Sequence, residues 1–136
     1  MGLHWHPLPR PDDRLAAGVL DVALKSGDPE WADQLLGRIR RGWADPWGVV
    51  DSAGVFLGGL VLLVDGESLC ALAAWVEPEH RDRSGELLAA GSEWLVDEAR
   101  RRGLRRVLFV TSRVGWRRIA PGLGWSPVSA TWGRPA

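Results

Sequence analysis

Hydrophobic residues recur along the chain with two different spacings, and the switches between them mark the expected elements. Alternation with a period of two predicts strands, whereas recurrence every three or four residues predicts helices. Extended spacing predicts strands near 3–8, 48–50, 55–64, 69–76, 106–111 and 128–132. Helical spacing predicts two helices between 11 and 41, a long helix from about 85 to 102 and a short helix at 114–119. The chain is therefore expected to fold as an α/β (α+β) protein.

The segment 69–111 forms the centre of this plan. Pro78 ends its first strand, because proline cannot donate a hydrogen bond to a sheet. The long helix then carries one apolar stripe, and Gly103 ends it. The stripe consists of Leu87, Leu88, Gly91, Trp94, Leu95 and Ala99, and the helix is expected to pack on the sheet through Leu88, Leu95 and Ala99. A strand, a helix and a further strand predict a βαβ unit with parallel strands. In such units the turn that enters the helix is where a phosphate-bearing ligand binds.

Length and charge limit the possible classes of protein. A chain of 136 residues suits one core, so we expect a single domain covering 1–136. The 17 basic and 17 acidic residues balance, which argues against a nucleic-acid partner. The apolar runs are too short to span a bilayer and no signal pattern is present, so we expect no membrane association and a cytoplasmic location.

Two short features of the sequence bear on metal binding and on disulfide formation. His4 and His6 share one face of the first predicted strand, but no third ligand group lies nearby in the sequence, so no metal is expected. Cys70 is the single cysteine, which excludes an intrachain disulfide. Neither feature indicates a metal-dependent or a disulfide-stabilised protein.

The order of predicted elements resembles the GCN5-related N-acetyltransferase (GNAT) fold over nearly the whole chain. The best local matches are Val76-Glu77-Pro78-Glu79-His80-Arg81, the helix end Glu98-Ala99-Arg100-Arg101-Arg102-Gly103, and Leu123-Gly124-Trp125, which is similar to the family's Leu-Gly-Phe. The resemblance implies a mixed, mostly antiparallel sheet with a central βαβ unit and flanking helices. It also implies acyl-CoA as the donor, with its pyrophosphate on the turn before the long helix.

The same resemblance assigns candidate site residues. The positions that would bind the donor are Val76, Arg81, Arg83, Ser84 and Gly85. Glu77 is the candidate general base toward an amine. These assignments hold only if the chain binds acyl-CoA.

The family's phosphate-binding motif, Gln/Arg-x-x-Gly-x-Gly/Ala, is altered here. Counting back from the helix end places Arg83 on the first position and Glu86 and Leu88 on the two glycine positions. A carboxylate repels phosphate, and a leucine side chain keeps phosphate away from the backbone. The family's Asn and Tyr positions fall on Arg113 and Ala120, and the chain contains no tyrosine. We therefore expect no cofactor, or acetyl-CoA if the protein is an enzyme.

Tryptophan is unusually frequent, with nine in the chain, and six of the nine lie outside the clear core periodicities. Tryptophan is enriched at protein–protein contacts. The strand at 128–132 is expected to expose an unpaired edge, which invites a partner. We therefore expect protein partners or self-association through Trp5, Trp125 and Trp132.

Two functional hypotheses follow. The first is a GNAT-like protein that has lost catalysis and serves as a structural or assembly subunit, and small GNAT-like proteins of tailed phages extend this analogy to a virion location. The alternative is an acyl-CoA-dependent N-acetyltransferase that acts on an unknown amine.

Overall fold

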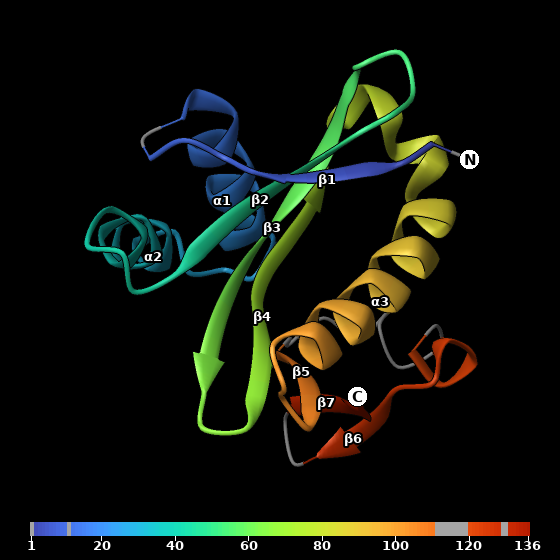
Figure 1. Ribbon diagram of the computed structural model, residues 1–136. Coiled ribbons are helices and arrows are strands. Elements are labelled where there is room, and N and C mark those ends of the chain that lie inside the picture. Colours follow the sequence, from blue (N-terminus) through green and yellow to red (C-terminus); the bar gives the residue numbers. More distant parts are fainter. Residues whose placement is uncertain (1, 11, 111–119, 129–130) are drawn as a thin grey trace. The chain divides into compact units, whose positions relative to one another are not determined.

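The computed structural model describes residues 2–10, 12–110, 120–128 and 131–136 (Figure 1). The chain divides into two compact units, each of which is treated separately below. The first unit comprises Met1–Leu63 and Ala73–Asp82, and the second comprises Val64–Leu72 and Arg83–Ala136. The expectation of one domain over 1–136 stays a prediction.

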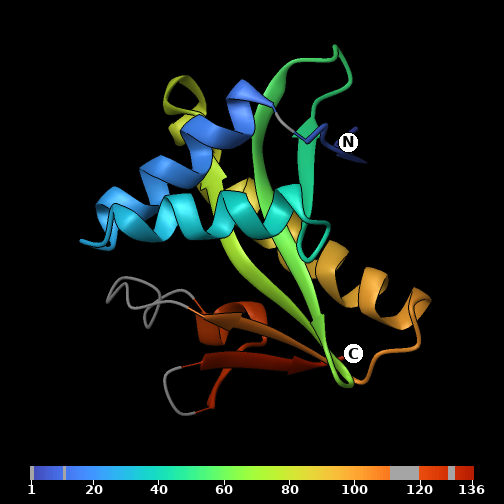
Figure 2. The same cartoon turned by 90° about the vertical axis from the view of Figure 1, so that its left-hand side faces the viewer.

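The first unit contains an antiparallel sheet and two helices. Its strands are β1 (His4–Pro7), β2 (Asp45–Val50), most of β3 (Phe56–Asp65) and the end of β4 (Ser68–Val76). β2 pairs with β1 on one side and with β3 on the other. The helices α1 (Asp13–Lys25) and α2 (Glu30–Arg40) lie side by side, as Figure 2 shows in blue and cyan. These elements confirm the predicted strand, helix pair and antiparallel strands, and β2 begins three residues earlier than expected.

Helix α1 begins where its sequence provides a cap. The Asp12 carboxylate accepts hydrogen bonds from the backbone N–H groups of Arg14 and Leu15, over 2.8 and 3.1 Å. This satisfies two of the donors that a helix start leaves unpaired. Gly27 follows the helix with a φ of +76°, a conformation that glycine adopts without strain, so the predicted stop is confirmed.

The core of the first unit is built around Trp75 of β4, which is 7% exposed. A Cβ added to Gly18 of α1 would lie 2.1 Å from the Trp75 ring, and one added to Gly59 of β3 would lie 2.5 Å from it. A Cβ at Gly58 would lie 2.2 Å from the Trp75 carbonyl oxygen. The close backbone approach expected at Gly58 and Gly59 is therefore confirmed, because these glycines leave the room that the indole and its strand occupy.

The second unit contains the predicted βαβ unit. Its strands pair in the order β4, β5 (Arg106–Val110), β7 (Thr131–Pro135) and β6 (Ser126–Val128). β4 and β5 are parallel, from Ser68 opposite Arg106 to Ala71 opposite Phe109. The 3₁₀ segment η1 (Pro78–Arg83) leads into α3 (Ser84–Arg101), and a second 3₁₀ turn, η2 (Ala120–Leu123), precedes β6. The predicted short helix at 114–119 lies outside the described residues.

Helix α3 buries most of its predicted apolar stripe. Leu87, Leu95 and Ala99 are buried, as the stripe predicts, whereas Leu88 is only half-buried. The stripe therefore follows a spacing of four residues between Leu87, Gly91 and Leu95.

The C-terminal segment departs from the prediction. The expected strand at 128–132 is two strands, β6 and β7, which pair antiparallel with Val128 opposite Thr131. β7 lies between β5 and β6, so the expected unpaired edge at 128–132 is wrong for β7. The edge position falls to the three-residue β6, where Pro127 suits a strand with one open side. Truncation after Gly124 would therefore remove an interior strand and damage the fold itself.

Candidate functional site

Glu77 lies at the carboxyl end of β4 in the first unit. Its backbone N–H donates a hydrogen bond to the Leu57 carbonyl over 2.8 Å, which fixes the last residue before Pro78 against β3. Trp75 and Glu77 are two residues apart, so they share one face of the strand. Val76, the candidate for donor binding that lies between them in the sequence, is half-buried and belongs to the opposite face.

The surroundings of Glu77 favour its protonated form. Burial is the main cause that raises the pKa of the Glu77 carboxyl, and the charges of Glu79 and Asp21 raise it further. The positive charges of Arg14 and His80 lower that pKa by less. Its carboxylate makes no hydrogen bond or ion pair with any residue in the described part of the chain. A partly buried carboxyl group with a raised pKa suits proton transfer.

Arg81 forms an ion pair with Asp21, and both residues belong to the first unit. Its guanidinium lies 3.5 Å from the Asp21 carboxylate of α1, which also accepts a hydrogen bond from Lys25 over 2.9 Å. The sequence analysis did not single out Asp21. Arg14, Gly18 and Asp21 recur at helical spacing, and this pattern was the available signal that one face of α1 carries both charge and a glycine.

Arg83, Ser84 and Gly85 lie at the start of α3 in the second unit. Arg83 is the N-cap residue, and its side chain does not cap the backbone N–H groups of the first turn. Instead, its guanidinium donates to the Glu86 carboxylate over 2.6 Å. That contact lowers the pKa of the exposed Glu86 carboxyl group. A Cβ added to Gly85 would meet nothing within 4 Å, so the backbone there is sterically open.

The helix start changes the alignment of the phosphate motif. Because α3 begins at Ser84, Leu88 lies in its second turn. The expectation that Leu88 blocks phosphate stays a prediction. Counting from Arg81 instead places Ser84 and Glu86 on the two glycine positions of Arg-x-x-Gly-x-Gly/Ala, a register the sequence analysis missed. Glu86 remains the substitution that opposes an anion.

The other family positions contribute no acid group in the described residues. Ala120, at the Tyr position, is fully buried in η2, and its side chain cannot donate a proton. Arg113, at the Asn position, lies outside the described residues.

The tryptophans predicted to form an interface differ in position. Trp125 is 3% exposed and donates a hydrogen bond from Nε1 to Ser92 Oγ, so its burial within the second unit argues against a contact role. Trp5 is half-buried in β1. Trp132 lies in β7 opposite Phe109. Self-association or partner binding stays a prediction.

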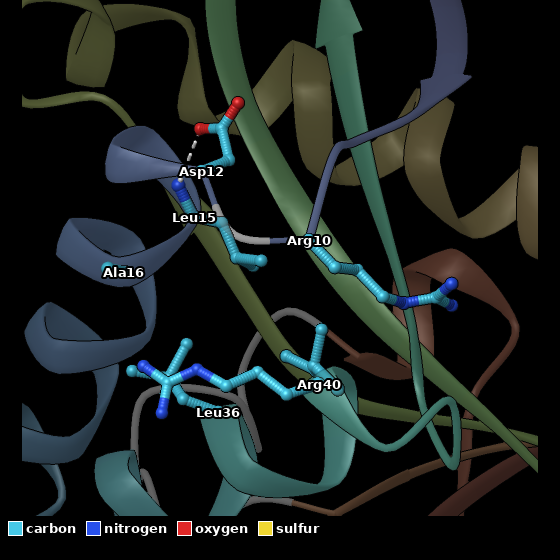
Figure 3. A pocket seen from close by; sticks show the side chains of 7 residues that line it. Arg10, Asp12, Leu15, Ala16, Leu36 and Arg40 are labelled. Atoms are coloured by element: carbon cyan, nitrogen blue, oxygen red, sulfur yellow. Dashed lines mark hydrogen bonds between the residues drawn. The ribbon is translucent and has the colours of Figure 1, made fainter.

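A small cavity lies between α1 and α2 in the first unit (Figure 3). Its volume is about 30 Å³, which holds little more than a water molecule. Its lining consists of Arg10, Asp12, Leu15, Ala16, Leu36, Ile39 and Arg40. The Arg10 side chain extends away from Arg40 toward Asp45, with which it pairs over 2.6 Å. The cavity is therefore too small and its charges too divergent for a substrate site.

Two kinds of feature, a membrane-spanning helix and a cluster of metal ligands, are absent from the described residues. No helix among them is long and apolar enough to cross a membrane. No group of three or more His, Cys, Asp or Glu side chains among them is placed to hold a metal ion, and this includes His4 and His6.

Charge is divided unequally between the two units. The sequence of the first unit contains 11 acidic and 7 basic residues, whereas that of the second contains 6 acidic and 10 basic residues. Acidic surroundings raise the local concentration of cations, and basic surroundings that of anions. The two units are therefore suited to ligands of opposite charge.

No protein-family profile matches the chain, and no curated protein matches it in sequence. Solved structures do match it. A GNAT-family acetyltransferase from Staphylococcus aureus Mu50 aligns with a TM-score of 0.71, 12% identity and 98% coverage of both chains. A Vibrio cholerae spermidine N-acetyltransferase in complex with CoA and spermine aligns with a TM-score of 0.69 and 12% identity, covering 98% of this chain and 95% of the other.

A Bacillus subtilis acetyltransferase in complex with CoA gives a TM-score of 0.68 with 10% identity, covering 98% of this chain and 99% of the other. Identities this low carry information about the fold alone. The chain has the GNAT fold, a mixed and mostly antiparallel α+β architecture with flanking helices, as predicted from the sequence.

Proposed function

We propose that the protein is an N-acyltransferase that transfers an acyl group from acyl-CoA to an amine, with Glu77 as the general base. The observation that carries this proposal is the Glu77 carboxyl group. It is half-buried, has a raised pKa, and lies at the end of β4 with no ion pair among the described residues. An amine is mostly protonated at neutral pH, so a base must remove a proton before its nitrogen can act as a nucleophile.

The start of α3 fits acyl-CoA at its backbone. The first-turn N–H groups lack a side-chain cap, and Gly85 leaves room for close approach. Helix N-termini of this kind bind phosphate through those N–H groups and the helix dipole. Arg83 and Ser84 would add a cation and a hydroxyl to the same site. When bound, acyl-CoA would supply the acyl group as an activated thioester.

Glu86 opposes this fit, but only weakly. Its side chain is 54% exposed, and its pairing with Arg83 is a surface contact that water and salt screen. Both side chains are therefore free to rearrange when an anion arrives. The excess of basic residues in the second unit also favours an anionic donor, and the acidic excess of the first unit favours a cationic amine.

A second candidate is a GNAT-fold subunit that has lost catalysis and acts in an assembly. Glu86 at a glycine position of the phosphate motif, together with the lack of any tyrosine, favours this candidate. The virion location inferred from phage analogy stays a prediction.

Acyl transfer from acetyl-CoA to a panel of mono-, di- and polyamines, followed as release of free thiol, tests the proposal. We expect turnover by the wild type and a loss in kcat/KM of about 100-fold or more for Glu77→Gln, the usual contribution of a general base. Glu30→Gln is the matched control, because it removes an exposed carboxylate of α2 that is not among the charges acting on Glu77. Absence of both thiol release and CoA binding in the wild type would favour the second candidate.

A further inference from the structure

Three cations, Arg14 and Lys25 of α1 and Arg81 of η1, each contact a group other than Glu77. The Arg14 guanidinium lies 3.2 Å from the Asp12 carboxylate and 4.4 Å from the centroid of the Phe56 ring. Lys25 and Arg81 both contact the Asp21 carboxylate, over 2.9 and 3.5 Å. Two cations are therefore held on one carboxylate of α1, on the same face of the helix as Gly18, which contacts Trp75.

We propose that Asp21 is a positioning residue for Glu77: it holds Arg81 and Lys25, so that Glu77 stays unpaired and able to accept a proton. The inference rests on the proposed function, since it concerns the same base. Asp21 does not touch the reacting atoms in this proposal; it acts through Arg81.

Among these cations, Arg81 is the one closest in sequence to Glu77 and therefore the one expected to pair with it if Asp21 is removed. It lies four residues after Glu77, across the 3₁₀ segment η1, and its side chain is 48% exposed. Without Asp21, the carboxylates nearest to Arg81 in the sequence are Asp82 and Glu79 of η1 and Glu77 just before it, and the backbone of Glu77 is fixed against β3. An ion pair with Arg81 would favour the charged form of Glu77 and occupy the oxygens that must receive the proton.

The groups that face Glu77 come from two elements. Arg14 and Asp21 belong to α1, whereas Glu79 and His80 both belong to η1. The negative charge of Asp21 also acts directly on Glu77, because it disfavours a second carboxylate nearby. Loss of Asp21 therefore has two effects in the same direction, one direct and one through Arg81, and an experiment must separate them.

A double-mutant cycle separates the two effects without needing any activity. The Glu77 carboxyl group is titrated by carbon NMR in the ligand-free protein, in the wild type and in the Asp21→Asn, Arg81→Gln and doubly substituted variants. We expect Asp21→Asn to move the Glu77 titration to lower pH and Arg81→Gln alone to leave it nearly unchanged. The double variant should recover more than half of the displacement, because the freed cation is then absent.

Two results would overturn the proposal. One is a Glu77 titration that does not move in Asp21→Asn; the other is a displacement that persists in full in the double variant, which would leave only the direct effect. Asp13→Asn is the matched control, since it removes an exposed carboxylate from the same helix and should leave Glu77 unaffected. Asp21→Ser replaces Asp21→Asn if the amide variant fails to fold.

Acyl transfer gives the second readout. We expect Asp21→Asn to lower kcat/KM at pH 7 by about tenfold and to shift the acidic limb of its pH profile to lower pH, whereas Asp21→Glu stays within about threefold of the wild type. A purely structural role would lower the melting temperature and leave the pH limb in place. If the wild type transfers no acyl group, the proposed function fails, and the NMR cycle still decides whether Asp21 keeps Arg81 off Glu77.

Discussion

The indole Nε1 of Trp125 donates a hydrogen bond to the hydroxyl of Ser92 over 3.0 Å, and both residues are 3% exposed. Ser92 Oγ in turn donates to the Leu88 carbonyl of α3 over 2.9 Å. The Trp125 ring also meets Phe109 of β5 edge to face, with 6.4 Å between the ring centroids. One serine thus connects the segment after η2 to the middle of α3 within the second unit.

Replacing Ser92 with alanine should destabilise the protein by about 1–3 kcal/mol, because it removes the buried hydrogen bond from the indole N–H to Ser92 Oγ. Chemical denaturation monitored by tryptophan fluorescence measures the change. Ser26→Ala is the control: its side chain is exposed, and it should change the free energy of unfolding by less than about 0.5 kcal/mol. Equal effects of the two substitutions would contradict the role of the hydrogen bond.

Replacing Gly18 with alanine should cost about 3 kcal/mol or more, because the new methyl group would overlap the Trp75 ring. Gly37 of α2 offers the opposite case. An added Cβ there meets nothing within 4 Å, so Gly37→Ala should stabilise the helix by up to about 1 kcal/mol. Thermal unfolding of both variants should show melting temperatures that move in opposite directions, and a tolerated Gly18→Ala would contradict the packing around Trp75.

Replacing Asp12 with alanine removes the cap of α1 and should cost about 1 kcal/mol at pH 7. Burial raises the pKa of the Asp12 carboxyl, but hydrogen bonds from Arg14 and Leu15 and the charge of Arg14 outweigh it, so the net pKa is lowered. A lowered pKa means that the folded state binds fewer protons than the unfolded state. This stabilisation is therefore present above the unfolded pKa of about 4 and is lost as the pH falls through the folded value.

Urea denaturation across a pH series checks this prediction. The difference in the free energy of unfolding between wild type and Asp12→Ala should shrink as the solution becomes strongly acidic. Asp13→Ala is the comparison, since Asp13 is exposed in the first turn of α1 and provides no cap. A difference that stays constant with pH would show that the carboxylate charge is not responsible.

Wild-type affinity for acetyl-CoA should be weak, with a dissociation constant above about 10 μM, or about −7 kcal/mol. Glu86→Gln should tighten binding several-fold, because it removes a negative charge from the first turn of α3 without adding bulk. Leu88→Ala should leave the affinity within about twofold, since Leu88 lies in the second turn. Calorimetry measures all three dissociation constants. Tighter binding by Leu88→Ala alone would support the alignment that begins at Arg83 and places Leu88 on the second glycine position.

The sequence predicted the order of elements well where local signals were strong. Pro78, Gly103 and the capping Asp12 mark ends that the structure confirms to within a residue or two. The C-terminal hairpin was missed because apolar and polar residues at 126–135 fit one strand as well as two. Only the pairing of β7 with both β5 and β6 decides between these, and pairing is a tertiary property.

The candidate site was predictable in its residues and less so in their relationships. Glu77 follows from its place before Pro78 at a strand end. Asp21 is 56 positions earlier, and its contact with Arg81 depends on how α1 packs against the sheet, which Gly18 permits by leaving room for Trp75. The register of the phosphate motif is likewise not fixed by the sequence, because Arg81 and Arg83 both suit its first position.

The position of β7 between β5 and β6 has a consequence for synthesis of the chain. During translation, β4, α3 and β5 leave the ribosome before 131–135 have been made, so β5 must wait with one edge unpaired. Such an edge can pair with another nascent chain. The second unit therefore completes its sheet only after 131–135 have been made, and slow translation of 111–130 would lengthen the interval in which β5 is open to misassembly.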